Sequence, residues 1–468
     1  MQLKKGEEIS LSIEKLAYGG AGIGYLQIDD KKLVVFVEGT LPQDEVTAKL
    51  KKIKPNYIEA ELDEVTKESP LRVKPRCPHF DVCGGCSLQT LSYEEQLLSK
   101  ELQVKESLEH IGGFVEPPMK KIIGCKDPWF YRNKMEFSFG TRDIDDDEVT
   151  VGLHPKHRRY DVFQVKTCFL ETNDIGNLMT TVQKFVRKHK LTPYHFKSNT
   201  GLLRSITVRE GKRTGKRLVN LLTSGEPFEQ TDEFLKILTE DAKKNGYKEA
   251  TSVYLTQQVI QKGRRTEFKE ILLHGEKPLL ETMILEDGSK LDFEILPMAF
   301  FQPNTLQAEI LYDTALRLGD VSKKDIVFDL FCGTGTIGLF CAHKAKQVFG
   351  VDLNKNAIEN AQNNAKTNNI KNVEFAVGDA LKIVSERTEK PDIVIVDPPR
   401  NGLGEKLCEH LLEIKAPQII YVSCNPTTLA RDLKQLCEEA YTLETVQPVD
   451  MFPHTYHIET VCKLVYNH

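Results

Sequence analysis

Cys424 is the residue whose surroundings most strongly suggest chemistry. It ends the apolar run of APQIIYVSCNPTTLARDL (416–433), and Pro426 stands where the first turn of a helix would begin. The pattern predicts a buried strand that delivers the thiol at its carboxyl end, beside a helix N-terminus. There the helix dipole lowers the pKa of a thiol and favours the nucleophilic thiolate. A buried structural cysteine is the alternative on this evidence alone.

A glycine-rich turn predicts a nucleotide-cofactor site. The segment DIVFDLFCGTGTIGLFCAHKA (325–345) is typical of a strand, a turn and a helix, and Gly333, Gly335 and Gly338 allow a ligand to approach the backbone. The next predicted strand ends in Asp352, about 20 residues later, where a carboxylate can accept hydrogen bonds from both ribose hydroxyls. The same spacing also fits a dinucleotide fingerprint, so a nicotinamide enzyme is an alternative.

Two later strands favour a methyltransferase over a hydride-transfer enzyme. One, NVEFAVGDA (372–380), ends in Asp379, which is placed to hold an adenine amino group; the other, DIVIVDPPR (392–400), ends in Asp397 and two prolines. A D-P-P turn presents polar groups rigidly to a flipped-out base, because proline fixes φ and removes backbone donors. The alternative is an ordinary turn that ends a strand.

The C-terminal segment PVDMFPHTYHIETVCKLVY (448–466) supplies candidates for a general base. Glu459 stands at the start of the last predicted strand, and His454 and His457 are its rivals. A reaction that passes through a covalent adduct needs such a base near the nucleophile. Glu459 as an ordinary carboxylate at a strand end is the alternative.

Several segments, taken together, resemble one family. They are FFQPNTLQAE (300–309), DLFCGTGTIGL (329–339), DPPRNGL (397–403), YVSCNPTTLARDL (421–433), DMFPHTYHIETV (450–461) and CPHFDVCGGC (77–86). Running across nearly the whole chain in the expected order, they resemble the class I S-adenosylmethionine-dependent RNA uracil-5-methyltransferases that carry an N-terminal TRAM barrel and an iron-sulfur cluster. The chain departs from many relatives in having Asp352 in place of Glu and Pro303 in place of Val, Thr or Leu. Neither change removes a reacting group.

The resemblance implies roles for individual residues. Cys424 would be the nucleophile, Glu459 the base, and Phe300 a neighbour of the target ring. Carbon 5 of uracil is too weak a nucleophile to attack a sulfonium methyl group, but thiolate addition at carbon 6 creates an enolate that can. The residues that would contact S-adenosylmethionine or bound uracil are Gln302, Phe331, Asp352 and Asp397.

Cys77, Cys83 and Cys86 form a C-x5-C-x2-C group in a loop rich in proline and glycine. The resemblance adds Cys168 as the fourth ligand of a [4Fe-4S] cluster, and Cys125 competes for that place. Structural zinc is the alternative occupant, since four thiolates suit both metals. Four protein ligands would close the site, so the role that we expect is structural or RNA-docking.

The elements predict three domains. Residues 1–65 form short strands broken by glycine turns, typical of a small TRAM-like or OB-like β-barrel. Residues 66–290 form a mixed α+β central RNA-binding domain with the iron-sulfur site, and its helix over 92–113 is expected to pack on the catalytic domain. Residues 291–468 alternate strands and helices as an α/β Rossmann-like methyltransferase domain does.

Bulk properties set the remaining expectations. The chain has 468 residues, of which 40% are hydrophobic, and no apolar run approaches the roughly 20 residues of a membrane helix. With its polar N-terminus and its thiols expected to stay reduced, we expect a cytoplasmic monomer without a membrane partner. The net charge is −5, yet the segment 187–217 holds ten Lys or Arg against Glu210 alone, so a phosphate-binding face competes with a solvated surface.

The cluster motif and the barrel favour 23S ribosomal RNA as the substrate, because the family's transfer-RNA enzymes lack both. Transfer-RNA uridine-5 methylation is one alternative, and exocyclic amine methylation without a thiol is another. A third is an RNA-binding iron-sulfur protein that has lost its activity, which the intact Asp352, Cys424 and Glu459 argue against.

Overall fold

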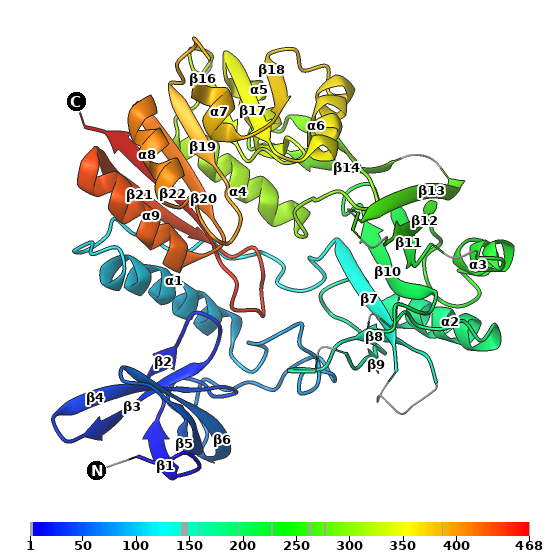
Figure 1. The fold of residues 1–468 in the computed structure, drawn as a ribbon, viewed down its shortest axis with the longest axis horizontal. Helices are drawn as coiled ribbons and strands as arrows, with labels where there is room; N and C mark the ends of the chain where they lie inside the picture. The colour runs from blue at the N-terminus through cyan, green and yellow to red at the C-terminus, as the bar shows by residue number, and fades with distance from the viewer. Residues whose placement is uncertain are drawn as a thin grey trace. The chain divides into compact units, whose positions relative to one another are not determined.

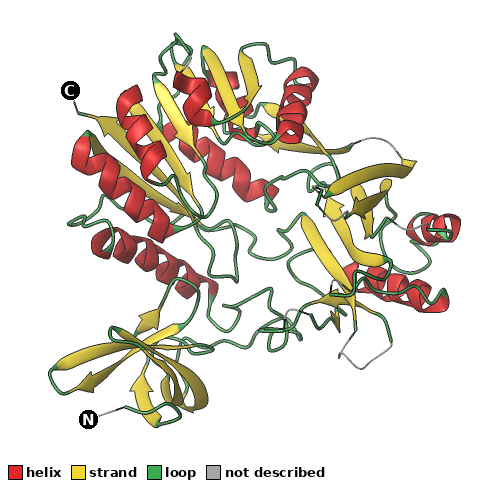
Figure 2. Ribbon diagram, viewed as in Figure 1, coloured by secondary structure: helices red, strands yellow, loops and turns green. Residues whose placement is uncertain are grey.

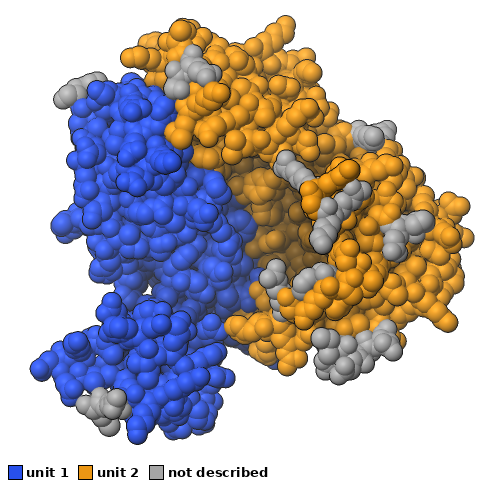
Figure 3. Space-filling view, viewed as in Figure 1, with its two compact units in different colours: residues 1–76, 85–128, 398–468 blue, residues 77–84, 129–397 orange. Residues whose placement is uncertain are grey.

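The computed structural model describes residues 3–141, 148–158, 160–195, 197–225, 228–260, 263–264, 266–275, 278–385 and 387–467. These residues group into two compact units. Unit 1 comprises residues 1–76, 85–128 and 398–468, and unit 2 comprises residues 77–84 and 129–397 (Figure 3). The division into three domains stays a prediction, since each unit combines segments from more than one predicted range. In the described residues no helix has the length and apolar character of a membrane span.

The N-terminal part of unit 1 is a curled sheet with strand order β1-β5-β6-β4-β3-β2 (Figure 1). Its strands are β1 (Glu8–Ser12), β2 (Lys15–Leu16), β3 (Gly22–Ile28), β4 (Lys31–Val37), β5 (Glu45–Ile53) and β6 (Tyr57–Lys67). Alternate side chains enclose a core that includes Leu11, Val35, Val46 and Ile58. The predicted run of short strands over 1–65 is confirmed, and we call this part the barrel.

Helix α1 (Tyr93–His110) matches the helix predicted over 92–113, and Ser92 caps it by accepting a hydrogen bond from the Glu95 N–H. Lys100 Nζ lies 2.6 Å from Asp450 Oδ1, with both side chains fully buried, and the Tyr93 hydroxyl donates to Asp450 Oδ2 at 2.8 Å. Because breaking a buried pair strands a charge, these contacts fix the segment after Val449 to α1.

The C-terminal part of unit 1 is an antiparallel sheet with order β20-β22-β21. Its elements are α8 (Glu405–Ile414), β20 (Gln418–Ser423), α9 (Pro426–Glu439), β21 (Tyr441–Val449) and β22 (Glu459–Tyr466). Helix α9 begins at Pro426, as predicted, and Asn425 is its N-cap.

Unit 2 begins with a mixed sheet of order β13-β12-β11-β10-β7-β8-β9. Its elements are β7 (Lys134–Gly140), β8 (Thr150–Leu153), β9 (Phe163–Gln164), α2 (Ile175–Lys188), β10 (Leu203–Glu210), β11 (Arg217–Thr223), α3 (Thr231–Leu238), β12 (Ser252–Val259) and β13 (Glu267–Gly275). All neighbours pair antiparallel except β11 and β12. The mixed α+β character predicted for this region is confirmed.

The rest of unit 2 contains a parallel sheet in the order β18-β17-β16-β19. Its elements are β14 (Leu279–Ile284), β15 (Lys290–Ile295), α4 (Thr305–Leu318), β16 (Ile326–Leu330), α5 (Thr336–Lys344), β17 (Gln347–Asp352), α6 (Lys355–Thr367), β18 (Val373–Val377), α7 (Ala380–Ser385) and β19 (Ile393–Val396). Helices alternate with these strands along the chain (Figure 2), which is the predicted Rossmann-like pattern. Parallel strands bring their carboxyl ends to one edge, where such sheets hold ligands.

Candidate active site

In unit 1 the candidate nucleophile and base lie at the end of one strand pair. Strands β20 and β22 pair antiparallel with Ser423 opposite Thr460, so Cys424 follows and Glu459 precedes that rung of the ladder. Residues opposite each other across adjacent strands lie about 4.5–5.5 Å apart between their Cβ atoms. Cys424 is half-buried, whereas Glu459 is only 4% exposed. The strand register therefore places the two predicted residues at the same end of the β20–β22 pair.

Contacts on both sides shape the backbone at Cys424. The Asn425 side-chain oxygen accepts from the Thr427 N–H at 3.1 Å, and its amide nitrogen donates to the Arg400 carbonyl at 3.0 Å. On the other side, the hydroxyl of Tyr18, a residue of the barrel, donates to the Cys424 carbonyl at 3.2 Å. Reasoning from the sequence did not find Tyr18, because the contact joins residues 406 positions apart.

The two histidines that rivalled Glu459 occupy different settings. His454 is buried, with Nδ1 lying 3.2 Å from the Gln96 side chain of α1, and burial lowers its pKa to about 4. His457 lies beside the ring of Tyr456, with 4.3 Å between ring centroids, and within 3.5 Å of the Arg400 guanidinium. His454 therefore serves the junction with α1, which leaves Glu459 as the buried carboxylate at the strand end.

In unit 2 the predicted cofactor turn connects β16 to α5. Phe331 has a φ of 71° and Gly335 a φ of 78°. A Cβ on Gly335 would lie 2.7 Å from the Phe375 ring, so this position requires glycine for space as well as for conformation. The Gly333 N–H donates to Asp352 Oδ2 at 3.0 Å, and Asp352 Oδ1 accepts from the Asn354 N–H at 2.8 Å. Asp352 is thus held against the turn, at the end of β17.

Two carboxyl groups at the ends of β16 and β19 are poorly accommodated as anions. Burial raises the pKa of Asp397 to about 7, and burial together with the charge of Asp397 raises the pKa of Asp329 to about 8. A cationic ligand beside them would stabilise their ionised forms. Asp329 was missed in the sequence, although it stands at the strand end directly before the glycine turn.

The remaining predicted cofactor and substrate residues also belong to unit 2. Gln302 is buried, and its carbonyl accepts from the Asn133 side chain at 2.8 Å. Phe300, two residues earlier, is 66% exposed. Asp379 is exposed, and its carboxylate accepts from the Leu381 N–H at 2.8 Å at the start of α7. The structure thus keeps Gln302 in a fixed hydrogen-bonded setting and leaves Phe300 accessible.

Comparison with known proteins decides the family. The tRNA (uracil-5-)-methyltransferase family model matches residues 234–466, and the TRAM domain model matches residues 2–62. An uncharacterized RNA methyltransferase of Protochlamydia amoebophila is 39% identical over 440 residues, covering 91% of this chain and 98% of the relative. Another, from Clostridium acetobutylicum, is 37% identical and covers 99% of this chain and 98% of the relative. The chain belongs to the tRNA (uracil-5-)-methyltransferase family.

A solved structure supports the same conclusion. The Pyrococcus abyssi tRNA (uracil-54, C5)-methyltransferase, in complex with S-adenosyl-L-homocysteine, matches with a TM-score of 0.72 and 28% identity, covering 98% of this chain and 100% of that one. The class I methyltransferase fold and the TRAM barrel predicted from the sequence are confirmed. The chain is an RNA (uracil-5-)-methyltransferase, which decides against the nicotinamide alternative.

Four cysteines carry the predicted iron-sulfur site, and the structure describes all four. Burial raises the pKa of Cys168 to about 11, and the nearby Cys77, also in unit 2, contributes to that shift. Cys83 donates its N–H to the His79 carbonyl at 2.7 Å, and Cys86 belongs to unit 1. Among the described residues no three or more His, Cys, Asp or Glu side chains are placed to hold a metal ion. The predicted cluster site therefore gains no support.

The basic segment 187–217 is partly internal. Arg217 is fully buried and forms ion pairs with Glu210 and, at 2.9 Å, with Asp174. Arg209 is also buried and donates to the Pro297 and Ala299 carbonyls. By contrast, the Arg204 guanidinium stacks 3.3 Å above the Tyr194 ring. Counting charges in the sequence therefore overstates the number of cations available to bind phosphate, because Arg209 and Arg217 are buried and bind partners inside the protein.

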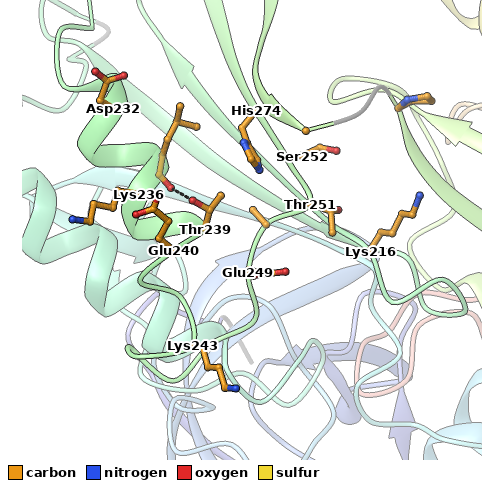
Figure 4. Close-up of a pocket in the computed structure, with 14 residues that line it drawn as sticks. Lys216, Asp232, Lys236, Thr239, Glu240, Lys243, Glu249, Thr251, Ser252 and His274 are labelled. Carbon is orange, nitrogen blue, oxygen red and sulfur yellow. Dashed lines mark hydrogen bonds between the residues drawn. The ribbon is translucent and has the colours of Figure 1, made fainter.

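A separate cavity in unit 2 lies where α3 faces the ends of β11, β12 and β13 (Figure 4). Its volume is about 900 Å³. Its charged lining residues are Lys216, Lys236, Lys243, Asp232, Glu240 and Glu249. The two signs are mixed, so the cavity does not select a polyanion, and its lining shares no residue with the predicted cofactor site.

Proposed function

We propose that this enzyme transfers a methyl group from S-adenosylmethionine to carbon 5 of a uridine in structured RNA, with Cys424 as the covalent nucleophile and Glu459 as the base. The observation that carries the proposal is the register of β20 and β22: Ser423 pairs with Thr460, and Cys424 and Glu459 are the next residues at that end of the strand pair. Supporting it are the family assignment and the complex of the Pyrococcus abyssi enzyme with S-adenosyl-L-homocysteine.

The two residues divide the chemistry between them. The Cys424 thiolate adds to carbon 6 of the uracil ring, which turns carbon 5 into the nucleophilic end of an enolate. S-adenosylmethionine supplies the electrophilic methyl group that this carbon takes up. Glu459 then removes the proton from carbon 5, the ring double bond re-forms, and the Cys424 thiolate is expelled. The enzyme ends with its thiolate restored and one proton on the base.

The proposed cofactor residues are those of unit 2. Phe331 and the glycine turn line the approach, Asp352 would accept from the ribose hydroxyls, and Asp379 from the adenine amino group. Asp397 and Gln302 would contact the cofactor or the bound uracil. The raised pKa of Asp397 fits a site made for a ligand with positive charge, such as the sulfonium and ammonium groups of the cofactor.

The more specific part of the proposal is which RNA the enzyme modifies. Large-subunit ribosomal RNA was predicted from the barrel and the cysteine motif. The Pyrococcus abyssi tRNA enzyme, however, matches this chain over 98% of its length, barrel included, and this observation favours transfer RNA as the second candidate. Mapping 5-methyluridine in both RNAs from cells with and without the gene separates the two, since only the true substrate loses the modification.

One experiment tests the reaction type. The purified enzyme is incubated with methyl-labelled S-adenosylmethionine and total RNA from a strain that lacks the gene, and the labelled nucleosides are separated. The proposal expects 5-methyluridine as the labelled product. Label in an N-methylated adenosine, cytidine or guanosine would instead support exocyclic amine methylation, and no transfer would support an RNA-binding protein without activity.

The [4Fe-4S] cluster on Cys77, Cys83, Cys86 and Cys168 stays a proposal that rests on the resemblance, and no step of the mechanism uses it. Protein purified without oxygen is expected to hold about four iron atoms per chain and to lose them in Cys83→Ser. Cys437→Ser is the matched control, because Cys437 is a half-buried cysteine of α9 outside the motif. Zinc in place of iron would support the alternative metal.

A further inference from the structure

The barrel reaches the end of strand β20 through one loop. This loop, residues 17–21, connects β2 to β3, and its Tyr18 hydroxyl donates to the Cys424 carbonyl at 3.2 Å. The Tyr18 ring also meets the Tyr456 ring edge-on, with 6.0 Å between centroids. Gly20 lies against the same side chain, since a Cβ there would be 3.7 Å from Tyr456. Tyr18, a residue of the TRAM barrel, thus contacts the backbone of the candidate nucleophile.

Several other contacts hold the loop in this place. Lys15, in β2, pairs with Glu106 of α1 at 2.5 Å, and the Gln103 side chain of α1 donates to the Leu16 carbonyl at 3.4 Å. Leu16 and Leu41 of the barrel share a buried cluster with residues just before α1. Figure 1 shows β2 beside α1. Because α1 is itself fixed to Asp450 through Lys100, the loop is tied to the segment that leads to Glu459.

The surroundings of Tyr18 keep its hydroxyl a donor. Burial raises its pKa to about 12, and the nearby Cys424, Tyr456 and Glu459 add to this, while Arg400 opposes it. At any pH where a thiol and a carboxyl group change charge, Tyr18 therefore stays protonated. Its hydrogen bond to the Cys424 carbonyl persists whether the neighbouring thiol is charged or neutral.

We propose that Tyr18 is a positioning residue of the methylating site: its hydrogen bond to the Cys424 carbonyl holds the turn between β20 and α9 so that the thiol addresses carbon 6 of the bound uracil. The proposal rests on the proposed function in taking Cys424 as the nucleophile. Tyr18 acts through the backbone and carries no proton in the reaction. The barrel then contributes to the chemistry as well as to binding RNA.

Tyr18→Phe tests the role, because it keeps the ring against Tyr456 and removes only the hydroxyl. Tyr25→Phe, the same change on β3, is the matched control, since Tyr25 contacts Lys32 within the barrel. Losing one neutral hydrogen bond is expected to lower kcat about fivefold to tenfold while KM for RNA stays within about twofold. Tyr25→Phe should change neither. Unfolding temperatures of both variants check that each is folded.

A second readout separates this proposal from the proposed function. Total RNA from a strain that lacks the gene, grown with 5-fluorouracil, carries a fluorine at carbon 5 that the base cannot remove, so the covalent adduct accumulates. The rate of adduct formation in Tyr18→Phe should fall by the same factor as kcat. An equal rate in Tyr18→Phe and wild type, or a raised KM with unchanged kcat, overturns the positioning role. If the wild-type enzyme forms no adduct, the covalent mechanism itself is wrong.

Discussion

Arg217 in unit 2 and Glu459 in unit 1 are both buried ionisable side chains, and they differ in what surrounds them. In unit 2, Arg217 is enclosed by Glu210 and Asp174, so its charge is neutralised by permanent partners. In unit 1, Glu459 is buried at the same end of the β20–β22 pair as the half-buried Cys424. The first arrangement stabilises the fold, whereas the second leaves a nucleophile within reach of a substrate. Substitutions at Cys424 and Glu459 should therefore lower activity, whereas substitution of Arg217 should lower stability.

Cys424→Ala should have the largest effect on activity. Without the thiol, carbon 5 of uracil cannot become nucleophilic, so methyl transfer to RNA should fall below detection. Binding of S-adenosylhomocysteine, measured by calorimetry, and the unfolding temperature should stay near the wild-type values. A variant that still methylates uridine would place the nucleophile elsewhere.

Glu459→Gln should come next. Removing a general base costs about 10²–10⁴-fold in rate, and the step that slows is the loss of the carbon-5 proton. Methylated RNA bound covalently to the enzyme should therefore accumulate and be visible on a denaturing gel. If turnover slows without any adduct, proton removal is not the role of Glu459, and His457→Asn becomes the variant to measure.

Arg217→Met should show the reverse pattern. It leaves buried Glu210 with only the partly exposed Lys248 as a partner and takes the cation from half-buried Asp174. Breaking such a buried pair costs about 3–5 kcal/mol of the free energy of unfolding. Lys197→Met, in the same basic segment but exposed, should cost at most about 0.5 kcal/mol. Denaturant unfolding measures both. Equal losses in the two variants would contradict the division between interior and surface cations.

The smallest effect concerns pH. The pKa of Asp397 is raised to about 7 in the folded protein, above its value in an unfolded chain, so the group costs stability as pH rises through 7 and it ionises. A cationic ligand prefers the ionised form, so the affinity for S-adenosylmethionine should rise with pH, by at most about tenfold per unit, and level off above 8. Calorimetry between pH 6 and 9 measures this. Asp397→Asn should flatten the profile, and an affinity that falls with pH would contradict the account.

Local patterns predicted much of the fold and part of the site. The helix over 92–113, the barrel strands and the strand that ends before Cys424 follow from apolar periodicity and turn residues. The placement of Cys424 and Glu459 at one end of the sheet follows once β20 and β22 pair, since antiparallel register is regular. Tyr18 could not be found in this way, because nothing in its neighbourhood in sequence indicates which strand end the loop will touch.

The sequence also could not predict which charged side chains are buried. Arg217 and Lys197 look alike in a charge count, yet one is fully buried and the other is exposed. Asp329 could not be singled out from the sequence, because its burial and the proximity of Asp397 decide its pKa. The cysteine motif shows the limit most clearly, since Cys168 lies 82 residues after Cys86 and no periodicity specifies whether the two come together.

The most direct test of the account is to locate the covalent bond itself. Enzyme trapped on 5-fluorouridine-containing RNA is digested with protease and nuclease, and the modified peptide is sequenced by mass spectrometry. The account predicts a methylated fluorouridine attached to Cys424. A nucleotide on any other residue, or methylated RNA formed with no trapped peptide, would contradict it.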